Sequence, residues 1–183
     1  MPPISYSRPR SAGEALNALA TPHSHALGGG TDLLVAMREN LVRVEQIVDL
    51  RLLPGARDIT AHSDGSVRIG GGVRIADLAA NAEIGTRFAA LAQAAQVVGT
   101  PALRNMGTIA GNLGQRPRCW YFHRHVPCFK NGAAGCPAVE GENQYHAIFA
   151  DGPCLAVHPS DPAIALTALE ASVEILGPGE RQR

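Results

Sequence analysis

The four cysteines of this chain are the residues with the clearest capacity for chemistry. Cys119, Cys128, Cys136 and Cys154 fall within 36 residues, and the rest of the 183-residue chain has no cysteine. Their spacing, Cys-x8-Cys-x7-Cys-x17-Cys, lacks the paired Cys-x2-Cys knuckles of most structural zinc sites. Four thiolates from one irregular loop can instead bind a 4Fe-4S cluster, one ligand per iron. The spacing favours an iron-sulfur site and leaves zinc or two disulfides open.

Other side chains close to the cysteines in sequence could support such a site. The aromatic run at 120–122 could cover a cluster and partly exclude solvent, or it could pack as ordinary core. His123, His125 and His146 could serve as ligands or as hydrogen-bond donors to the sulfurs. A single histidine is more often an ordinary surface or core residue, and four cysteines already complete a cluster.

A glycine-rich loop, Gly28-Gly29-Gly30-Thr31-Asp32, is the second feature with chemical potential. It follows a short apolar stretch at 25–27 and precedes a helical pattern that begins at Leu33. Such a loop leaves backbone N–H groups free, and the helix dipole adds positive charge, so the loop can hold a phosphate or pyrophosphate. The alternative is a tight turn without a ligand, because the motif fits neither GxGxxG nor the P-loop.

A second candidate loop runs from Arg104 to Leu113 and reads RNMGTIAGNL. Two glycines, two asparagines and a threonine can present several donors to a flat polar ligand. The alternative is a polar loop stabilised by its own asparagines. Two loops of this kind in one small chain favour a nucleotide ligand.

The first 57 residues have the pattern of a small α/β unit that would position the glycine loop. Ser11 and Glu14 have capping-box spacing and predict a short helix. The apolar stretch at 25–27 predicts a strand, the pattern at 31–40 predicts a helix, and QIVDL at 46–50 predicts a returning strand.

The remainder of the chain has a different sequence pattern and would carry the second loop and the cysteines. The elements expected there are a hairpin around Asp64-Gly65, helices at 74–81 and 85–99, an irregular and functional stretch at 101–153, a helix from Ser160 to Leu169 and a strand at 171–176. Three of the four cysteines therefore belong to the irregular stretch, and Cys154 directly follows it.

Charge and hydropathy exclude some classes of partner. Sixteen Lys and Arg balance sixteen Asp and Glu without blocks of like charge, so we expect no nucleic acid and no anionic membrane as partner. No run approaches the roughly 18 apolar residues of a membrane span, and the N-terminus does not read as an export signal. We expect a cytoplasmic location, or a periplasmic one through a partner's export signal.

Three motifs, ALGGGTDLL, RNMGTIAGNL and HPSD, resemble the FAD-binding medium subunit of the xanthine dehydrogenase and aldehyde oxidoreductase (molybdenum hydroxylase) family. The stretch from NLGQRPRCWYF to GPC resembles the subgroup with an additional 4Fe-4S cluster, of the periplasmic aldehyde oxidoreductase and 4-hydroxybenzoyl-CoA reductase type. The resemblance covers essentially the whole chain.

The resemblance implies an α+β fold, a two-lobed FAD-binding domain of the molybdopterin dehydrogenase (PCMH-like) type. Its lobes would span 1–57 and 58–183, with an iron-sulfur loop inserted at about 114–157. It implies that FAD binds non-covalently and that the cluster is held by Cys119, Cys128, Cys136 and Cys154. The implied FAD-binding residues are Ala26, Leu27, Gly28, Gly29, Gly30, Thr31, Asp32, Leu33, Leu34, Thr108, Gly111, Asn112 and Asp161.

The implied function is that of an electron-transfer subunit. A partner subunit with a molybdenum cofactor would oxidise an aldehyde or aromatic substrate, or reduce an aromatic acyl-CoA, and a small 2Fe-2S subunit would relay electrons to FAD and an external acceptor. No general base or nucleophile is expected on this chain. Relatives continue beyond the position of Arg183, so we expect a fragment that lacks the rest of the second lobe. The alternatives are a nucleotide-binding module with a structural zinc, or a non-functional fragment.

Overall fold

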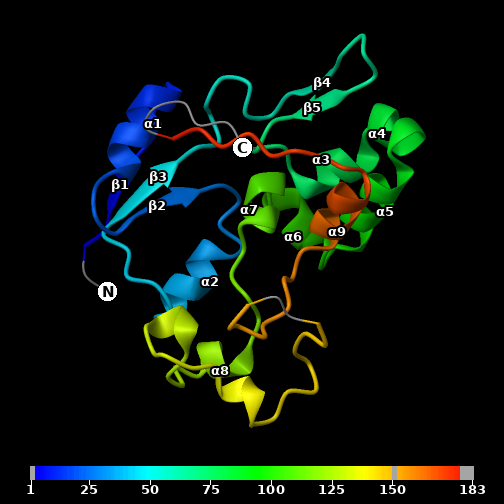
Figure 1. Cartoon of the computed structure of the whole chain (residues 1–183). Coiled ribbons are helices and arrows are strands. Elements are labelled where there is room, and N and C mark those ends of the chain that lie inside the picture. The colour runs from blue at the N-terminus through cyan, green and yellow to red at the C-terminus, as the bar shows by residue number, and fades with distance from the viewer. Residues whose placement is uncertain (1–2, 150–151, 178–183) are drawn as a thin grey trace.

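The computed structural model describes residues 3–149 and 152–177 and combines helices with two small sheets (Figure 1). The last residues, including those after Gly179, lie outside the described part. The strands are β1 (Ser5–Ser7), β2 (Ser24–Leu27), β3 (Gln46–Asp49), β4 (Ile59–Ala61) and β5 (Val67–Ile69). The α-helices are α1 (Ala12–Leu19), α2 (Leu33–Arg38), α3 (Ile75–Ala80), α4 (Ala82–Arg87), α5 (Ala89–Val97), α6 (Pro101–Met106), α7 (Ile109–Leu113), α8 (Trp120–His123) and α9 (Asp161–Ala168).

The N-terminal part is a parallel sheet with strand order β1-β3-β2. The expected helix forms as α1, and the Ser11 hydroxyl accepts a hydrogen bond from the Glu14 N–H at 3.2 Å. The expected strands form as β2 and β3, whereas β1 was not predicted because SYS lacks an apolar alternation. Parallel strands end at the same sheet edge. The glycine loop after β2 therefore begins beside Asp49, which pairs with Leu27 at the end of β3.

A hairpin and a helical layer make up most of the remainder. β4 and β5 pair antiparallel around the expected turn, where Gly65 takes a φ of +90° that favours glycine. The expected helix at 85–99 divides near Phe88 into the end of α4 and all of α5. One hydrophobic core joins these helices and is formed by Val73, Ile75, Leu78, Ile84, Leu91, Ala92, Ala95, Ile109 and Ala165.

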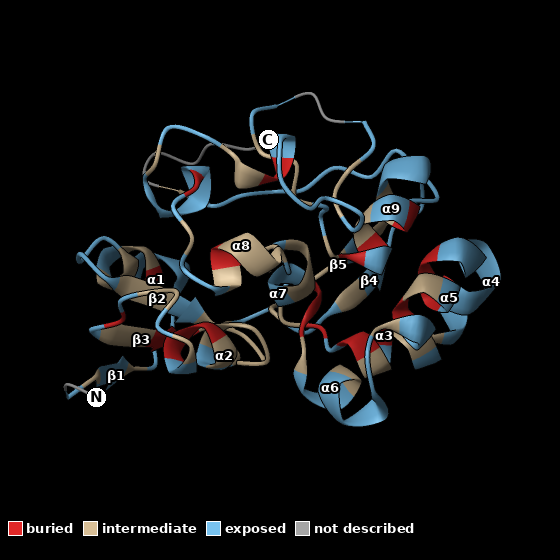
Figure 2. Cartoon of the chain, turned by 90° about the horizontal axis from the view of Figure 1, so that it is seen from below, coloured by how far each residue is buried: buried red, intermediate tan, exposed pale blue. Residues whose placement is uncertain are grey.

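The stretch expected to be irregular is only partly so. Its start forms two short helices, α6 and α7, whose N-terminal caps are Thr100 and Thr108. Among the described residues from 114 to 160, the regular elements are α8 and two 3₁₀ turns, η1 (Phe129–Asn131) and η2 (Pro137–Val139), and in Figure 1 this part lies below α2 and α7. Figure 2 shows mostly exposed backbone in this part, with a few buried positions.

Of the two elements predicted near the C-terminus, the helix is confirmed and the strand is not. Ser160 caps α9 as expected, and its hydroxyl accepts a hydrogen bond from the Ala163 N–H at 3.1 Å. The strand expected at 171–176 is wrong, because this segment pairs with no strand among the described residues. Its apolar side chains, such as Ile175, are exposed. None of the described helices has the length and apolar character that crossing a membrane requires.

Candidate ligand-binding cleft and cysteine segment

The two loops singled out in the sequence lie against each other. A Cβ atom added to Gly29 would lie 1.9 Å from the carbonyl oxygen of Met106, and one added to Gly28 would lie 2.6 Å from the Thr108 hydroxyl. No side chain fits at such distances, so both positions require glycine for this contact. Gly30 requires glycine for a different reason, because its φ is +76°. Loop packing alone thus accounts for much of the glycine motif.

Backbone hydrogen bonds attach the second loop to the helical layer. The Gly107 carbonyl accepts from the Ile75 N–H at 2.9 Å, and the Ile109 N–H donates to the Val73 carbonyl at 2.8 Å. Thr108 is buried, and its hydroxyl accepts from the Gly111 N–H at 3.2 Å as the cap of α7. The loop is therefore fixed on both sides of Thr108.

A cleft of about 170 Å³ opens where these loops meet. Typical ligand pockets measure roughly 300 to 1,000 Å³, so this cleft encloses one part of a long ligand. Six of the sequence-predicted residues line it: Thr31, Asp32, Thr108, Gly111, Asn112 and Asp161. The other seven do not: Ala26 and Leu27 end β2, Gly28, Gly29 and Gly30 form the loop beside it, and Leu33 and Leu34 begin α2.

The far wall of the cleft is joined by a network around Ser160. The Ser160 hydroxyl donates to the Asn112 side-chain oxygen at 2.5 Å, which ties the start of α9 to α7. Gln115 donates through its side-chain nitrogen to the carbonyls of Asn112 at 2.9 Å and Pro159 at 3.0 Å. These bonds bring Asp161 to the cleft although it lies 49 positions after Asn112 in the sequence.

Gln115, Arg118 and Pro159 also line the cleft, and the sequence did not single them out. The guanidinium of Arg118 lies 3.1 Å from one Asp32 oxygen, and the Arg116 backbone N–H donates to the other at 3.1 Å. The stretch that leads to Cys119 is thereby attached to the glycine loop. The only sequence signal for this contact was the position of Arg118, directly before Cys119 in the stretch that resembles the cluster-bearing subgroup.

The loop has backbone donors available for an anion. Asp32 does not cap α2 through its side chain, and within the described residues the N–H groups of Thr31, Asp32 and Leu33 donate to no acceptor. Free N–H groups, polar lining and close loop packing are what the pyrophosphate and ring of a flavin dinucleotide need. The residues present therefore fit FAD.

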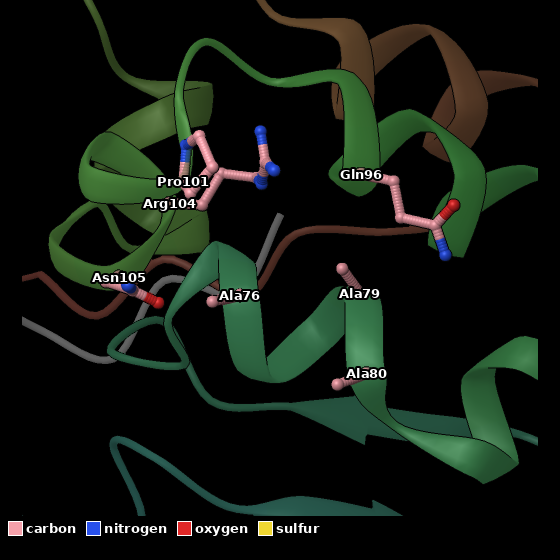
Figure 3. Close-up of a pocket in the computed structure, with 7 residues that line it drawn as sticks. All are labelled: Ala76, Ala79, Ala80, Gln96, Pro101, Arg104 and Asn105. Atoms are coloured by element: carbon pink, nitrogen blue, oxygen red, sulfur yellow. The ribbon is translucent and has the colours of Figure 1, made fainter.

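A larger hollow, about 370 Å³ in volume, lies on the other face of α6. Figure 3 shows three alanines of α3 opposite Pro101, Arg104 and Asn105, which share one face of α6, with Gln96 at the side. The Arg104 guanidinium donates to the carbonyls of Val98 at 3.0 Å and Gly99 at 3.2 Å. This hollow is wide and lacks convergent polar groups, so it is not the candidate site.

A buried ion-pair cluster lies at the carboxyl edge of the parallel sheet. Asp49 has no exposed surface and accepts from Arg51 through Nε at 2.9 Å, Nη2 at 2.8 Å and the backbone N–H at 3.0 Å. Tyr6 donates to it at 2.5 Å, and Arg8 lies 3.3 Å away. The hydrogen bonds from Arg51, followed by that from Tyr6, hold the pKa of Asp49 well below its usual range despite burial. The cluster joins β1 to β3 and has no role in the cleft lining.

The four cysteines are not brought together. Cys119, Cys128 and Cys136 occupy the positions just before α8, η1 and η2, and Cys154 lies in irregular chain. All four are free, so neither disulfide of the alternative is present. Among the described residues, no three Cys, His, Asp or Glu side chains gather as a metal site requires. The geometry as it stands fits neither a 4Fe-4S cluster nor a zinc ion.

The histidines of the segment have three different surroundings. His146 Nε2 lies 3.2 Å from the Cys119 sulfur, the ring packs edge-on to Trp120, and its buried Nδ1 has no partner among the described residues. His123 Nδ1 lies 2.8 Å from a Glu39 oxygen at the end of α2. His125 Nε2 lies 3.1 Å from the Glu39 carbonyl, so two histidines fasten the segment to α2.

Sequence comparison finds relatives over the whole chain. The chain is 37% identical over its full length to the aldehyde oxidoreductase FAD-binding subunit PaoB of Escherichia coli, of which it covers 58%. It is 30% identical over 82% of its length to the carbon monoxide dehydrogenase medium chain of Hydrogenophaga pseudoflava, of which it covers 52%. The chain thus spans between half and three fifths of the length of these two relatives.

Solved structures of similar fold belong to the same group. The carbon monoxide dehydrogenase of Hydrogenophaga pseudoflava matches with a TM-score of 0.57 and 34% identity, over 61% of this chain and 40% of that one. Quinoline 2-oxidoreductase from Pseudomonas putida 86 matches with a TM-score of 0.58 and 28% identity, over 61% of this chain and 39% of the other. Residues 2–183 match the profile of the FAD binding domain in molybdopterin dehydrogenase, and the chain belongs to this family.

Proposed function

We propose that this chain binds FAD and serves as the flavoprotein part of a molybdenum hydroxylase complex. The observation that carries the proposal is the cleft itself, where six residues predicted from three separate motifs line one opening. The family match over residues 2–183 and the 37% identity to an aldehyde oxidoreductase FAD-binding subunit support it independently.

The residues of the cleft have distinct tasks toward FAD. The free N–H groups at the start of α2 would hold the pyrophosphate, and Thr31 would add a hydroxyl. Thr108, Gly111 and Asn112 would lie along the flavin side, and Asp161 would also contact FAD. Bound FAD supplies the redox chemistry, and the protein supplies binding, orientation and electrostatics.

We also propose the partners that this role requires. The similar proteins carry the names of aldehyde oxidoreductase and carbon monoxide dehydrogenase subunits. In a complex of this type, a large subunit with a molybdenum cofactor would act on an aldehyde or aromatic substrate, or reduce an aromatic acyl-CoA. A small 2Fe-2S subunit would connect it to the FAD of this chain, which would exchange electrons with an external acceptor. The complex would reside in the cytoplasm, or in the periplasm through a partner's export signal.

The four cysteines carry a separate proposal, a 4Fe-4S cluster that forms only when residues 114–157 close around it. Four free thiols within 36 residues support it, as does the buried nitrogen of His146 beside Cys119, which has no partner among the residues that the structure describes. Because the thiols do not converge here, we derive no electron-transfer step through this cluster.

Anaerobic purification tests both cofactors at once, with absorption spectra and analysis of iron, sulfide, zinc and flavin. FAD with about four irons and four sulfides supports both proposals, given one ligand per iron. A Cys128→Ser variant should lose iron and keep FAD. Zinc without iron or flavin would favour the nucleotide-binding module with a structural zinc, and absence of every cofactor would favour the non-functional fragment.

A further inference from the structure

The two carboxylates that line the cleft oppose an anionic ligand unless a cation balances them. Asp32 and Asp161 place two carboxylates at the opening, and Arg118 is the only cation among the lining residues within the described part of the chain. A pyrophosphate carries negative charge of its own, and a like charge nearby in a partly desolvated site is costly. A cation at this cleft is therefore needed for the ligand to enter.

Arg118 is held in place but keeps donors free. Its Nη2 lies 3.1 Å from both the Asp32 carboxylate and the Gln115 side-chain oxygen. Its Nε and Nη1 donate to no acceptor among the described residues. The guanidinium is a rigid fork that matches two phosphate oxygens at once. About half of the Arg118 side chain is exposed, so a ligand can reach it.

We propose that Arg118 binds the pyrophosphate of FAD, bridging it to Asp32 of the glycine loop. The inference rests on the proposed function, because it assigns a residue to the same cleft. Arg118 directly precedes Cys119, so the residue that contacts the ligand is joined by one peptide bond to the first of the four cysteines. Arg118 is a binding residue here and has no part in proton or bond chemistry.

Affinity for FAD and for riboflavin, measured by flavin fluorescence on the purified chain, separates the two ends of the ligand. Charge-assisted hydrogen bonds contribute roughly 1.5 to 3 kcal/mol each, so Arg118→Gln should weaken FAD binding by about 10- to 100-fold. Riboflavin lacks phosphate, and its affinity should change by less than about twofold. Arg118→Lys should fall between, because it keeps the charge and loses the fork.

Arg116→Gln is the matched control, because it removes the same charge two positions away. Only the backbone N–H of Arg116 contacts Asp32, and its side chain does not line the cleft. FAD affinity should stay within about twofold of the unmodified chain, apart from a small salt-dependent effect.

An Asp32→Asn background distinguishes direct contact from neutralisation of Asp32. If Arg118 binds phosphate directly, Arg118→Gln should still weaken FAD binding about tenfold in that background. Disappearance of the loss there, or an equal loss for riboflavin, would overturn the proposal while leaving FAD binding intact. Failure of the unmodified chain to bind FAD would instead overturn the proposed function together with this assignment.

Discussion

The cleft and the cysteine segment differ in how far the polypeptide alone completes them. In the cleft, Thr108, Asn112 and Ser160 each have a hydrogen-bond partner on another element or cap a helix. In the cysteine segment all four thiols are free, no three potential metal ligands gather, and the buried Nδ1 of His146 has no partner among the described residues. Packing and hydrogen bonds of the polypeptide define the cleft, whereas they bring no three potential metal ligands together among the described residues of the cysteine segment.

The reach of the hydrogen bonds differs within the cysteine segment itself. His123 and His125 contact Glu39 of α2, 84 and 86 positions away. Around Cys128 the side-chain bonds are local: Asn131 accepts from the Cys128 N–H at 2.7 Å and donates to the Val126 carbonyl at 2.8 Å. In the cleft, the bond from Ser160 to Asn112 spans 48 positions. Local bonds can re-form after a loop rearranges, so the stretch around Cys128 is less firmly fixed than the cleft.

Asp49→Asn should produce the largest effect, because it removes a fully buried charge from Tyr6, Arg8 and Arg51. Breaking a buried pair costs roughly 3 to 5 kcal/mol, and the partial exposure of both arginines lowers our expectation to about 3 kcal/mol. Urea unfolding at pH 7 measures it. The reactivity of the four cysteines toward a thiol reagent in the folded state should stay the same, because the ion-pair cluster around Asp49 is remote from them. Faster labelling would contradict the separation of the two regions.

The same variant tests the direction of the pKa shift. The pKa of Asp49 is lower in the folded chain than in the unfolded chain. Its contribution is therefore fully present above the unfolded value of about 4 and is lost as pH falls toward the folded pKa. The unmodified chain should lose stability below about pH 4 more steeply than Asp49→Asn, and parallel profiles would contradict the assignment.

Gly29→Ala should produce the next largest loss of stability, because its Cβ would lie 1.9 Å from the Met106 carbonyl oxygen and overlap it. Overpacking costs roughly 1 to 3 kcal/mol, and a backbone neighbour that cannot rotate away excludes the low end of this range, so we expect about 2 kcal/mol. FAD affinity should fall as well, because the two loops separate. Gly13→Ala in α1 is the control, where nothing lies within 4 Å of the added atom and a gain of about 0.5 kcal/mol is expected.

Ser160→Ala should cost about 1 to 2 kcal/mol, because the residue caps α9 and also donates to Asn112. Loss of the bond frees the start of α9 from α7, so FAD affinity should fall with stability. Ser160→Thr keeps the hydroxyl and should recover most of both. A stability loss without any change in FAD affinity would show that Asp161 reaches the ligand independently of this bond.

The sequence predicted most of the elements that carry a local signal. Capping residues placed α1 and α9, and the Asp64-Gly65 turn placed the hairpin. The strand expected at 171–176 failed because its apolar alternation says nothing about whether a partner strand exists. β1 was missed for the converse reason, since its pairing with β3 comes from the tertiary fold and not from its own residues.

For the site, the motifs identified the loops but not the contact between them. Only the three-dimensional structure shows that Gly28 and Gly29 allow Thr108 and Met106 to approach the glycine loop. Arg118 and Gln115 lie in the stretch that resembles the cluster-bearing subgroup, but that resemblance assigned them no role, and their role comes from distances to Asp32 and Asn112. The cysteine ligand set remains a prediction.

His146→Phe gives the smallest effect and the sharpest test of the contrast. The substitution removes a buried nitrogen that has no partner in the part of the chain that the structure describes, and a weak contact with the Cys119 sulfur. The stability of the metal-free chain should therefore change by less than about 1 kcal/mol. His123→Phe is the control, because both of its ring nitrogens face acceptors, on Glu39 at 2.8 Å and on Pro117 at 3.0 Å. It should cost about 1 to 2 kcal/mol. Equal losses in the two variants would mean that His146 is satisfied by the polypeptide, and the segment would then be as complete as the cleft.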